Sequence, residues 1–145
     1  METKKILLIE DNEDDIELVK LSIDSVKILN SMDIVRDGEE AVEYLFCTGQ
    51  YSTRNPEDYP SVILLDLKLP KISGLEVLEK IRSNIKTKSL PVVIFTSSNQ
   101  EKDIIKGYEL GANSYIQKPV DFDKFKEAIQ QLNLYWIILN TKPII

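Results

Sequence analysis

Short apolar runs alternate along this chain with segments in which apolar residues recur at every third or fourth position. The runs at 6–9, 62–65 and 92–95 are apolar at each successive position, a pattern typical of strands covered on both faces. Residues 32–35 and 114–117 form weaker, more polar runs, which indicates edge strands. The pattern therefore predicts five strands of one sheet.

Helical periodicity separates these runs. Two longer helices are predicted from apolar residues three and four positions apart, which are Ile16, Val19, Ile23 and Val26 in the first and Phe122, Phe125, Ile129 and Leu132 in the second. Shorter helices are predicted at 39–46, 75–81 and 103–110. Five successive strand–helix units predict an α/β fold, a doubly wound, flavodoxin-like parallel sheet in the order 2-1-3-4-5 with helices on both faces.

Composition narrows the function classes. The 145 residues suit one domain, and a net charge of −6 argues against a general attraction to nucleic acid. The absence of histidine excludes histidine-based catalysis and histidine-ligated zinc. A single cysteine excludes an internal disulfide and fits a reducing, cytoplasmic location. Since no apolar run approaches membrane-spanning length, we expect no membrane partner.

Polar residues that could bind a metal ion or take part in a reaction follow the predicted strands. Glu10 and Asp11 come directly after the first apolar run, and Asp66 after the next fully apolar run. Thr96 follows the third such run, and Lys118 follows the last predicted strand. Because the carboxyl ends of parallel strands share one edge, where open α/β sheets bind ligands, we expect these side chains to converge.

Three converging carboxylates repel one another unless a cation lies between them. Oxygen ligands with open positions suit Mg²⁺, for which Mn²⁺ is a possible substitute. Beside such an ion, Asp66 could act as a nucleophile and form an aspartyl phosphate. The Lys118 ammonium and the Thr96 hydroxyl would then stabilise the phosphoryl oxygens. These groups predict a divalent-metal and phosphoryl site.

Each residue also has a simpler interpretation when it is taken alone. Asp11 could cap the first helix, since acids at helix N-termini are common. Thr96, with the two serines that follow it, could cap a later helix. Lys118 could be an ordinary exposed lysine. The joint placement of the three acids, the hydroxyl and the amine favours the metal and phosphoryl interpretation.

These motifs together resemble the receiver domain of two-component response regulators, the CheY-like group, over nearly all of residues 4–133. The segment at 9–12, with its Glu-Asp pair, is similar to the family's metal-binding acids, and the segment at 65–70 is similar to its phosphoacceptor loop. The resemblance implies that Asp66 accepts a phosphoryl group from a sensor histidine kinase. It also implies a metal site of Glu10, Asp11, Asp66 and the backbone carbonyl of Lys68.

The resemblance extends to a conformational switch. Thr96 is similar to the family's switch hydroxyl, Lys118 to its phosphate-binding lysine, and Tyr115 to its switch aromatic. It implies that phosphorylation draws Thr96 towards Asp66, that Tyr115 turns into the vacated space, and that a protein-binding surface changes. The chain would then be a signalling switch and not an enzyme. From the pattern alone, Tyr115 could equally be a half-buried strand aromatic.

The resemblance also suggests how the chain is organised. We expect a receiver domain over residues 1–133, an apolar extension of it over 134–145, and no output domain. The apolar stretch at 134–139 would either fold back onto the core or be covered in a homodimer. Together with the long predicted loop at 48–60, this tail resembles stand-alone regulators paired with phytochrome-type histidine kinases. Besides the kinase, we expect a downstream protein target or phosphotransfer protein as partner.

Three other functions compete with this interpretation. A flavodoxin-type FMN protein would need a hydroxyl- and glycine-rich phosphate loop, whereas an acidic segment follows the first strand here. A haloacid-dehalogenase-type phosphatase would carry a second aspartate two residues after the nucleophile, where this chain has Lys68. A degenerate receiver that serves only as a dimeric scaffold would not need the complete set of site residues.

Overall fold

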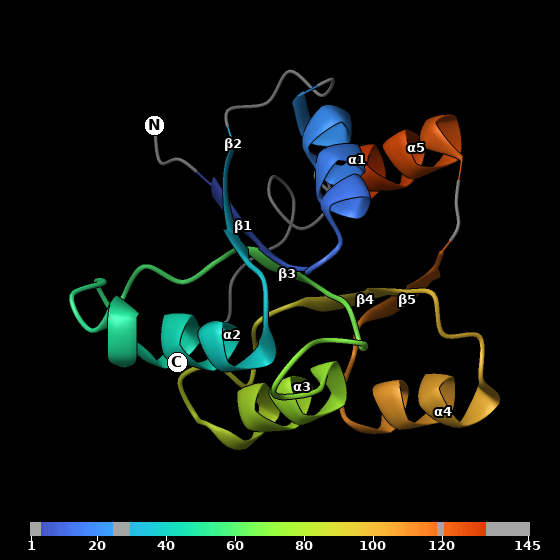
Figure 1. Cartoon of the computed structure of the whole chain (residues 1–145). Coiled ribbons are helices and arrows are strands. Elements are labelled where there is room, and N and C mark those ends of the chain that lie inside the picture. The colour runs from blue at the N-terminus through green and yellow to red at the C-terminus, as the bar shows by residue number, and fades with distance from the viewer. Residues whose placement is uncertain (1–3, 25–29, 119–120, 133–145) are drawn as a thin grey trace.

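The computed structural model describes residues 4–24, 30–118 and 121–132, in which strands and helices alternate (Figure 1). In chain order the elements are β1 (Lys4–Ile9), α1 (Glu13–Asp24), β2 (Asn30–Val35), α2 (Gly38–Phe46), the 3₁₀ turn η1 (Gly49–Tyr51), β3 (Val62–Leu65), α3 (Gly74–Ser83), β4 (Val92–Thr96), α4 (Glu101–Glu109), β5 (Ser114–Gln117) and α5 (Phe122–Leu132). Val26 and the predicted extension at 134–145 lie outside the described residues.

The five strands form one parallel sheet in the order β2-β1-β3-β4-β5, which confirms the predicted fold. Helices α1 and α5 cover one face, and α2, α3 and α4 lie on the other (Figure 1). Alternate residues of β1 divide between these layers, since Leu7 and Ile9 join the core under α2 and α3 while Ile6 and Leu8 join the core under α1 and α5. Burial on both faces explains why the central strands are continuously apolar.

Predicted and observed boundaries differ at several ends. β1 and β2 each begin two residues before the predicted run, and α4 begins at Glu101 instead of residue 103. β4 extends to Thr96, which is therefore a strand residue with no exposed surface. These extensions are polar residues that continue the backbone hydrogen bonding beyond the apolar signal.

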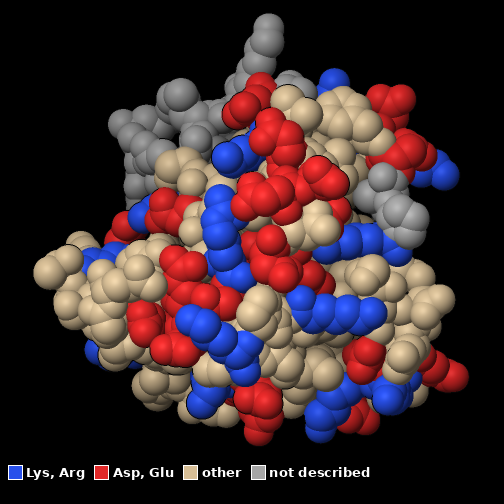
Figure 2. All heavy atoms as spheres, in the orientation of Figure 1, with Lys and Arg blue, Asp and Glu red and all other residues tan. Residues whose placement is uncertain are grey.

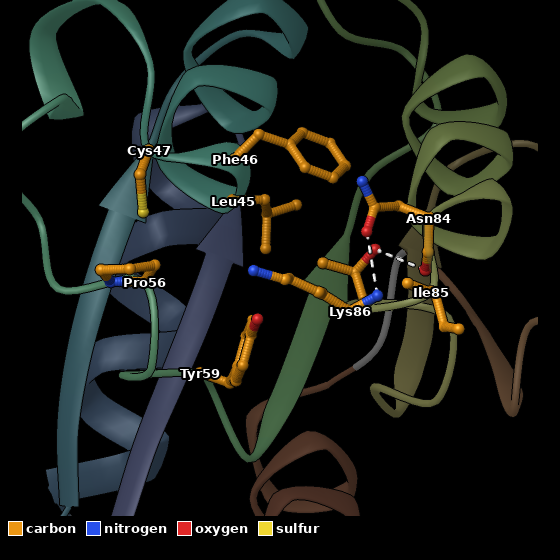
Figure 3. Close-up of a pocket in the computed structure, with 9 residues that line it drawn as sticks. Leu45, Phe46, Cys47, Pro56, Tyr59, Asn84, Ile85 and Lys86 are labelled. Atoms are coloured by element: carbon orange, nitrogen blue, oxygen red, sulfur yellow. Dashed lines mark hydrogen bonds between the residues drawn. The ribbon is translucent and has the colours of Figure 1, made fainter. Parts of the chain in front are cut away.

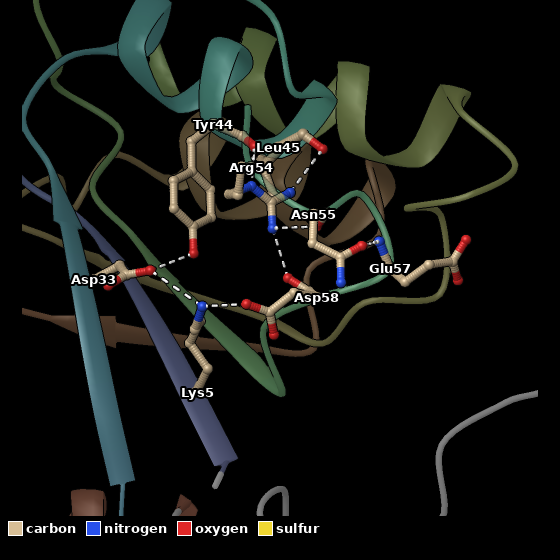
Figure 4. A network of polar contacts seen from close by, with 8 residues as sticks. All are labelled: Lys5, Asp33, Tyr44, Leu45, Arg54, Asn55, Glu57 and Asp58. Atoms are coloured by element: carbon tan, nitrogen blue, oxygen red, sulfur yellow. Dashed lines mark hydrogen bonds and ion pairs between the residues drawn. The ribbon is translucent and has the colours of Figure 1, made fainter. Parts of the chain in front are cut away.

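The loop at 48–60 is built around Arg54 (Figure 4). The guanidinium of Arg54 donates from Nε to the carbonyl of Tyr44 over 2.8 Å and from Nη1 to the carbonyl of Asp58 over 2.6 Å. It also lies over the Tyr44 ring, 4.4 Å from the centroid. Arg54 thus satisfies a carbonyl at the end of α2 and fixes the returning loop to it.

Charged and phenolic side chains fix the same loop to the sheet. Lys5 Nζ lies 2.5 Å from Asp58 and 3.4 Å from Asp33, and the Tyr44 hydroxyl donates to Asp33 over 2.6 Å (Figure 4). The Tyr51 hydroxyl of the loop donates to Glu40 of α2 over 2.6 Å. The predicted irregular loop is therefore a hydrogen-bonded part of the fold.

Tyr51→Phe should lower the free energy of unfolding by about 1 kcal/mol at neutral pH, because the Glu40 carboxylate loses a donor. Burial and the hydrogen bond to Glu40 raise the pKa of Tyr51 to about 12, while an unfolded tyrosine ionises near pH 10, about its usual value. The folded protein therefore favours the neutral phenol. The contribution of this phenol to the free energy of unfolding is complete below about pH 10 and is lost as the pH rises towards 12.

Urea unfolding of both proteins at neutral pH and at about pH 10.5 measures this difference. The advantage of the wild type over Tyr51→Phe should shrink at the higher pH. Ser52→Ala, at an exposed neighbouring position, is the matched control. An advantage that stays constant or grows with pH would contradict the assignment.

A pocket of about 430 Å³ opens between the end of α2, the loop at 48–60 and the turn after α3 (Figure 3). Its walls include Leu45, Pro56 and Tyr59, and the Lys86 side chain reaches into it. Cys47 lies at its side, half-buried and with a left-handed φ of 56°. Within the parts of the chain that the structure describes, no helix has the length and apolar character needed to cross a bilayer.

Candidate phosphoryl and metal site

The sheet register brings the predicted site residues to one edge. Ile9 of β1 pairs with Leu65 of β3, so the residues that follow them, Glu10 and Asp66, leave adjacent strands at the same level. The backbone N–H of Asp66 donates to the carbonyl of Ile9 over 3.0 Å and extends this pairing by one residue. This is the point at which the strand order reverses, the usual ligand position in such sheets.

Glu10, Asp11 and Asp66 form the predicted carboxylate cluster. One oxygen from each lies within 4.8 Å of the others. Glu10 has no exposed surface and Asp66 is 6% exposed, whereas Asp11 faces solvent. Figure 2 shows acidic side chains gathered over the region where β1, β3 and α1 meet, with basic side chains beside them. An oxygen-only set of this size fits one hard divalent cation with room for water or a ligand oxygen.

The Lys118 ammonium lies among these carboxylates. Its Nζ is 2.7 Å from Glu10 Oε1, 2.7 Å from Asp15 Oδ2 and 3.5 Å from Asp66 Oδ2. The Phe95 ring lies on another side, with its centroid 4.9 Å away. The Lys118 side chain is 11% exposed, so the simpler interpretation as an ordinary exposed lysine is wrong.

The protonation of this cluster reflects burial and charge together. The pKa of Glu10 is raised to about 7 on balance, because burial raises it most, the charge of Asp66 raises it too, and the hydrogen bond from Lys118 only partly opposes them. Burial alone would lower the pKa of Lys118, but its hydrogen bonds to Asp15 and Glu10 and the charge of Asp66 raise it on balance. The amine therefore stays an ammonium and supplies a fixed positive charge beside Asp66.

Two further contacts orient the loop after β3. The backbone N–H of Lys68 donates to Asp66 Oδ1 over 3.3 Å, so Lys68 lies beside the cluster. The N–H of Gly74 donates to the carbonyl of Leu67 over 2.9 Å and brings the start of α3 against the loop. The Lys68 carbonyl as a metal ligand stays a prediction.

Thr96 and Tyr115 are joined through the loop after β4. The Thr96 hydroxyl accepts the backbone N–H of Ser98 over 3.5 Å, and the Tyr115 hydroxyl donates to the Ser98 carbonyl over 3.0 Å. The Ser98 hydroxyl in turn donates to Asp103 of α4 over 2.5 Å. The predicted switch pair therefore belongs to one hydrogen-bonded unit with the first turn of α4.

The two capping interpretations are wrong. Asn12 accepts the backbone N–H of Asp15 at the start of α1, so this role does not fall to Asp11. The residue that precedes α4 is Gln100, which makes no side-chain capping hydrogen bond, and Thr96 lies within β4. The sequence reasoning missed Asp15, whose first-turn position has the common explanation of favouring a helix N-terminus.

A family model described as the response regulator receiver domain matches residues 6–130. Among curated proteins, the response regulator Rcp1 of Synechocystis is 38% identical over 140 residues, which are 97% of this chain and 93% of Rcp1. The probable methanogenesis regulatory protein FilR2 of Methanothrix harundinacea is 32% identical over 138 residues, 95% of this chain and 86% of FilR2.

Solved structures of response regulators are also similar to this chain. The phosphorylated cyanobacterial phytochrome response regulator RcpA superposes with a TM-score of 0.88 at 36% identity, covering 99% of this chain and all of RcpA. The Mn²⁺-bound form of Rcp1 superposes with a TM-score of 0.86 at 37% identity, covering 97% of this chain and 99% of that one. A phosphorylated state and a metal-bound state thus occur among close structural relatives.

Proposed function

Because the chain belongs to the response regulator receiver family, we propose that Asp66 accepts a phosphoryl group in a divalent-cation-dependent transfer and that this acceptance switches a protein-binding surface. The observation that carries the proposal is the Lys118 ammonium among the carboxylates of Glu10, Asp15 and Asp66. This arrangement places a nucleophile, the Asp66 carboxylate, and a fixed positive charge, the Lys118 ammonium, at one edge of the sheet.

In the transfer, a carboxylate oxygen of Asp66 forms a bond to phosphorus while the bond from phosphorus to the donor breaks, and the donor leaves with the electron pair. Lys118 would stabilise the negative charge on the phosphoryl oxygens, and Thr96 would donate its hydroxyl. Glu10, Asp11 and Asp66 would hold Mg²⁺ or Mn²⁺, with the Lys68 carbonyl as a further ligand. The bound cation would supply charge neutralisation at the phosphoryl oxygens.

The readout would pass through the unit formed by Thr96, Ser98 and Tyr115. Movement of the Thr96 hydroxyl towards a phosphoryl group on Asp66 would change its hydrogen bond with the backbone N–H of Ser98. The Tyr115 hydroxyl depends on the same residue, since it donates to the Ser98 carbonyl. The two side chains would therefore shift together, as a two-state switch requires.

Receiver domains are phosphorylated by histidine kinases, and we propose a kinase of the phytochrome type for this one. The likeness to RcpA, a phytochrome response regulator, over 99% of this chain supports that choice. A downstream protein or phosphotransfer protein would read the switched surface. We also propose a cytoplasmic location, which the single cysteine supports, and a homodimer, which the apolar stretch at 134–139 supports; that stretch lies outside the described residues.

Incubation with acetyl phosphate and Mg²⁺ followed by intact-mass measurement tests the function. We expect a gain of one phosphoryl group, abolished by Asp66→Asn and by a chelator. Asp24→Asn, which makes the same chemical change at the exposed end of α1, should still gain the group. A gain that persists in Asp66→Asn, or no gain under any condition, would refute phosphoryl acceptance at this residue.

A further inference from the structure

We propose that Asp15 is a positioning residue that holds the Lys118 ammonium at the carboxyl edge of the sheet. Its Oδ2 lies 2.7 Å from Lys118 Nζ, closer than the 3.5 Å that separates this Nζ from Asp66. The contact joins residues 103 positions apart. Its role in phosphoryl transfer rests on the proposed function, but the contact itself does not.

Asp15 is itself held in place. Its backbone N–H donates to the Asn12 side chain over 3.0 Å, which fixes the first turn of α1 at the end of β1. An acid three residues after a cap often reaches back to the capping residue, as in a capping box. Here the carboxylate is directed to Lys118, and its side chain is 25% exposed. Asp14, the preceding acid, is exposed and serves as a natural comparison.

The charges of the site explain why Lys118 needs a second carboxylate partner. The other short partner of Lys118 is Glu10, which also belongs to the cluster able to hold a cation. A cation held by Glu10, Asp11 and Asp66 would repel the ammonium and engage its Glu10 partner. Asp15 is not a member of that cluster among the described residues, so its carboxylate stays available to Lys118.

The Lys118 ammonium therefore has two short carboxylate partners. Glu10 is one that a bound cation would also use, whereas Asp15 lies outside the cation cluster and keeps the ammonium in position. With Asp15 in place, the ammonium is confined near Asp66 whatever occupies Glu10. Without it, and with a cation engaging Glu10, the four-carbon side chain would sample other positions, although the Phe95 ring would still lie beside it. We expect Asp15→Asn to slow phosphorylation by acetyl phosphate about tenfold at saturating donor, with little change in the donor concentration for half-maximal rate.

The first test uses metal-free protein and does not depend on phosphorylation. Limited acylation of amines with acetic anhydride at neutral pH, followed by peptide mass spectrometry, reports the reactivity of each lysine. We expect Asp15→Asn to raise the reactivity of Lys118 several-fold relative to the exposed Lys80, because an amine released from its carboxylate partner is more accessible to the reagent. Asp15→Glu should restore much of the protection.

Asp14→Asn is the matched control, since it removes the same charge one residue away and should leave Lys118 protected. Equal Lys118 reactivity in Asp14→Asn and Asp15→Asn would overturn the contact. A specific rise in reactivity, with phosphorylation rates equal in the two variants, would overturn the positioning role. If the wild type itself accepts no phosphoryl group, the proposed function fails, while the acylation result still decides the contact.

Discussion

Replacing Gly74 with alanine is expected to lower the free energy of unfolding by about 3 kcal/mol and to reduce phosphoryl acceptance at Asp66 severely. A Cβ at this first residue of α3 would lie 2.2 Å from the Asp66 carbonyl oxygen and 2.6 Å from the Leu67 Cα. Both contacts are with backbone atoms, so no side-chain rotation relieves them. The loop that carries the nucleophile must move instead.

Chemical denaturation gives the stability, and the acetyl phosphate assay gives the acceptance. Glu76→Ala is the matched control, because it places alanine two residues further along the same helix at an exposed position. We expect that variant to remain within about 0.5 kcal/mol of the wild type. A Gly74→Ala protein with wild-type stability and acceptance would show that the close approach of α3 to Asp66 is not required.

Replacing Arg82 with alanine is expected to destabilise the protein by about 3 kcal/mol, since several acceptors, some of them partly buried, would lose a charged donor together. The guanidinium donates to the Gly111 carbonyl from two nitrogens, over 3.0 and 2.7 Å. It also donates to the carbonyls of Lys88 and Leu90, over 3.0 and 2.7 Å, and to the Asn113 side chain. These bonds join α3 to the turn before β4 and to the turn before β5.

Arg82→Lys should recover only part of the loss, because one ammonium cannot reproduce the planar set of donors. Lys80→Ala, at an exposed position of the same helix, should cost little and serves as the control. Urea unfolding midpoints at constant m-value measure all three variants. An Arg82→Ala midpoint close to that of Lys80→Ala would contradict the role assigned to the guanidinium.

The fold and the acidic cluster could be predicted because both follow from backbone periodicity. Continuous apolar runs identify strands buried on two faces, and parallel strands place the residues after them at one edge. Glu10 and Asp66 follow such runs directly, so their proximity required no knowledge of side-chain conformation. Thr96 was also placed at this edge, although the strand includes it.

The contacts of Asp15, Arg54 and Arg82 could not be predicted in this way. Each depends on where the end of a flexible polar side chain lies, and each joins partners that are distant in the chain or that include a residue of an irregular segment. The loop at 48–60 shows this most clearly. Its Gly and Pro content predicts a turn-rich segment, but its path is determined by Arg54 at the end of α2.

Cys47 gives the protein a built-in attachment point for a spectroscopic probe. It is the only cysteine in the chain, and it terminates α2, whose first residue bonds to Pro70 in the loop after Asp66. Because α2 runs back along the sheet, a thiol-linked fluorophore on Cys47 would lie beside the pocket at the far end of the helix (Figure 3). A change in its emission on phosphorylation would report a signal carried through the protein, not contact with the phosphoryl group.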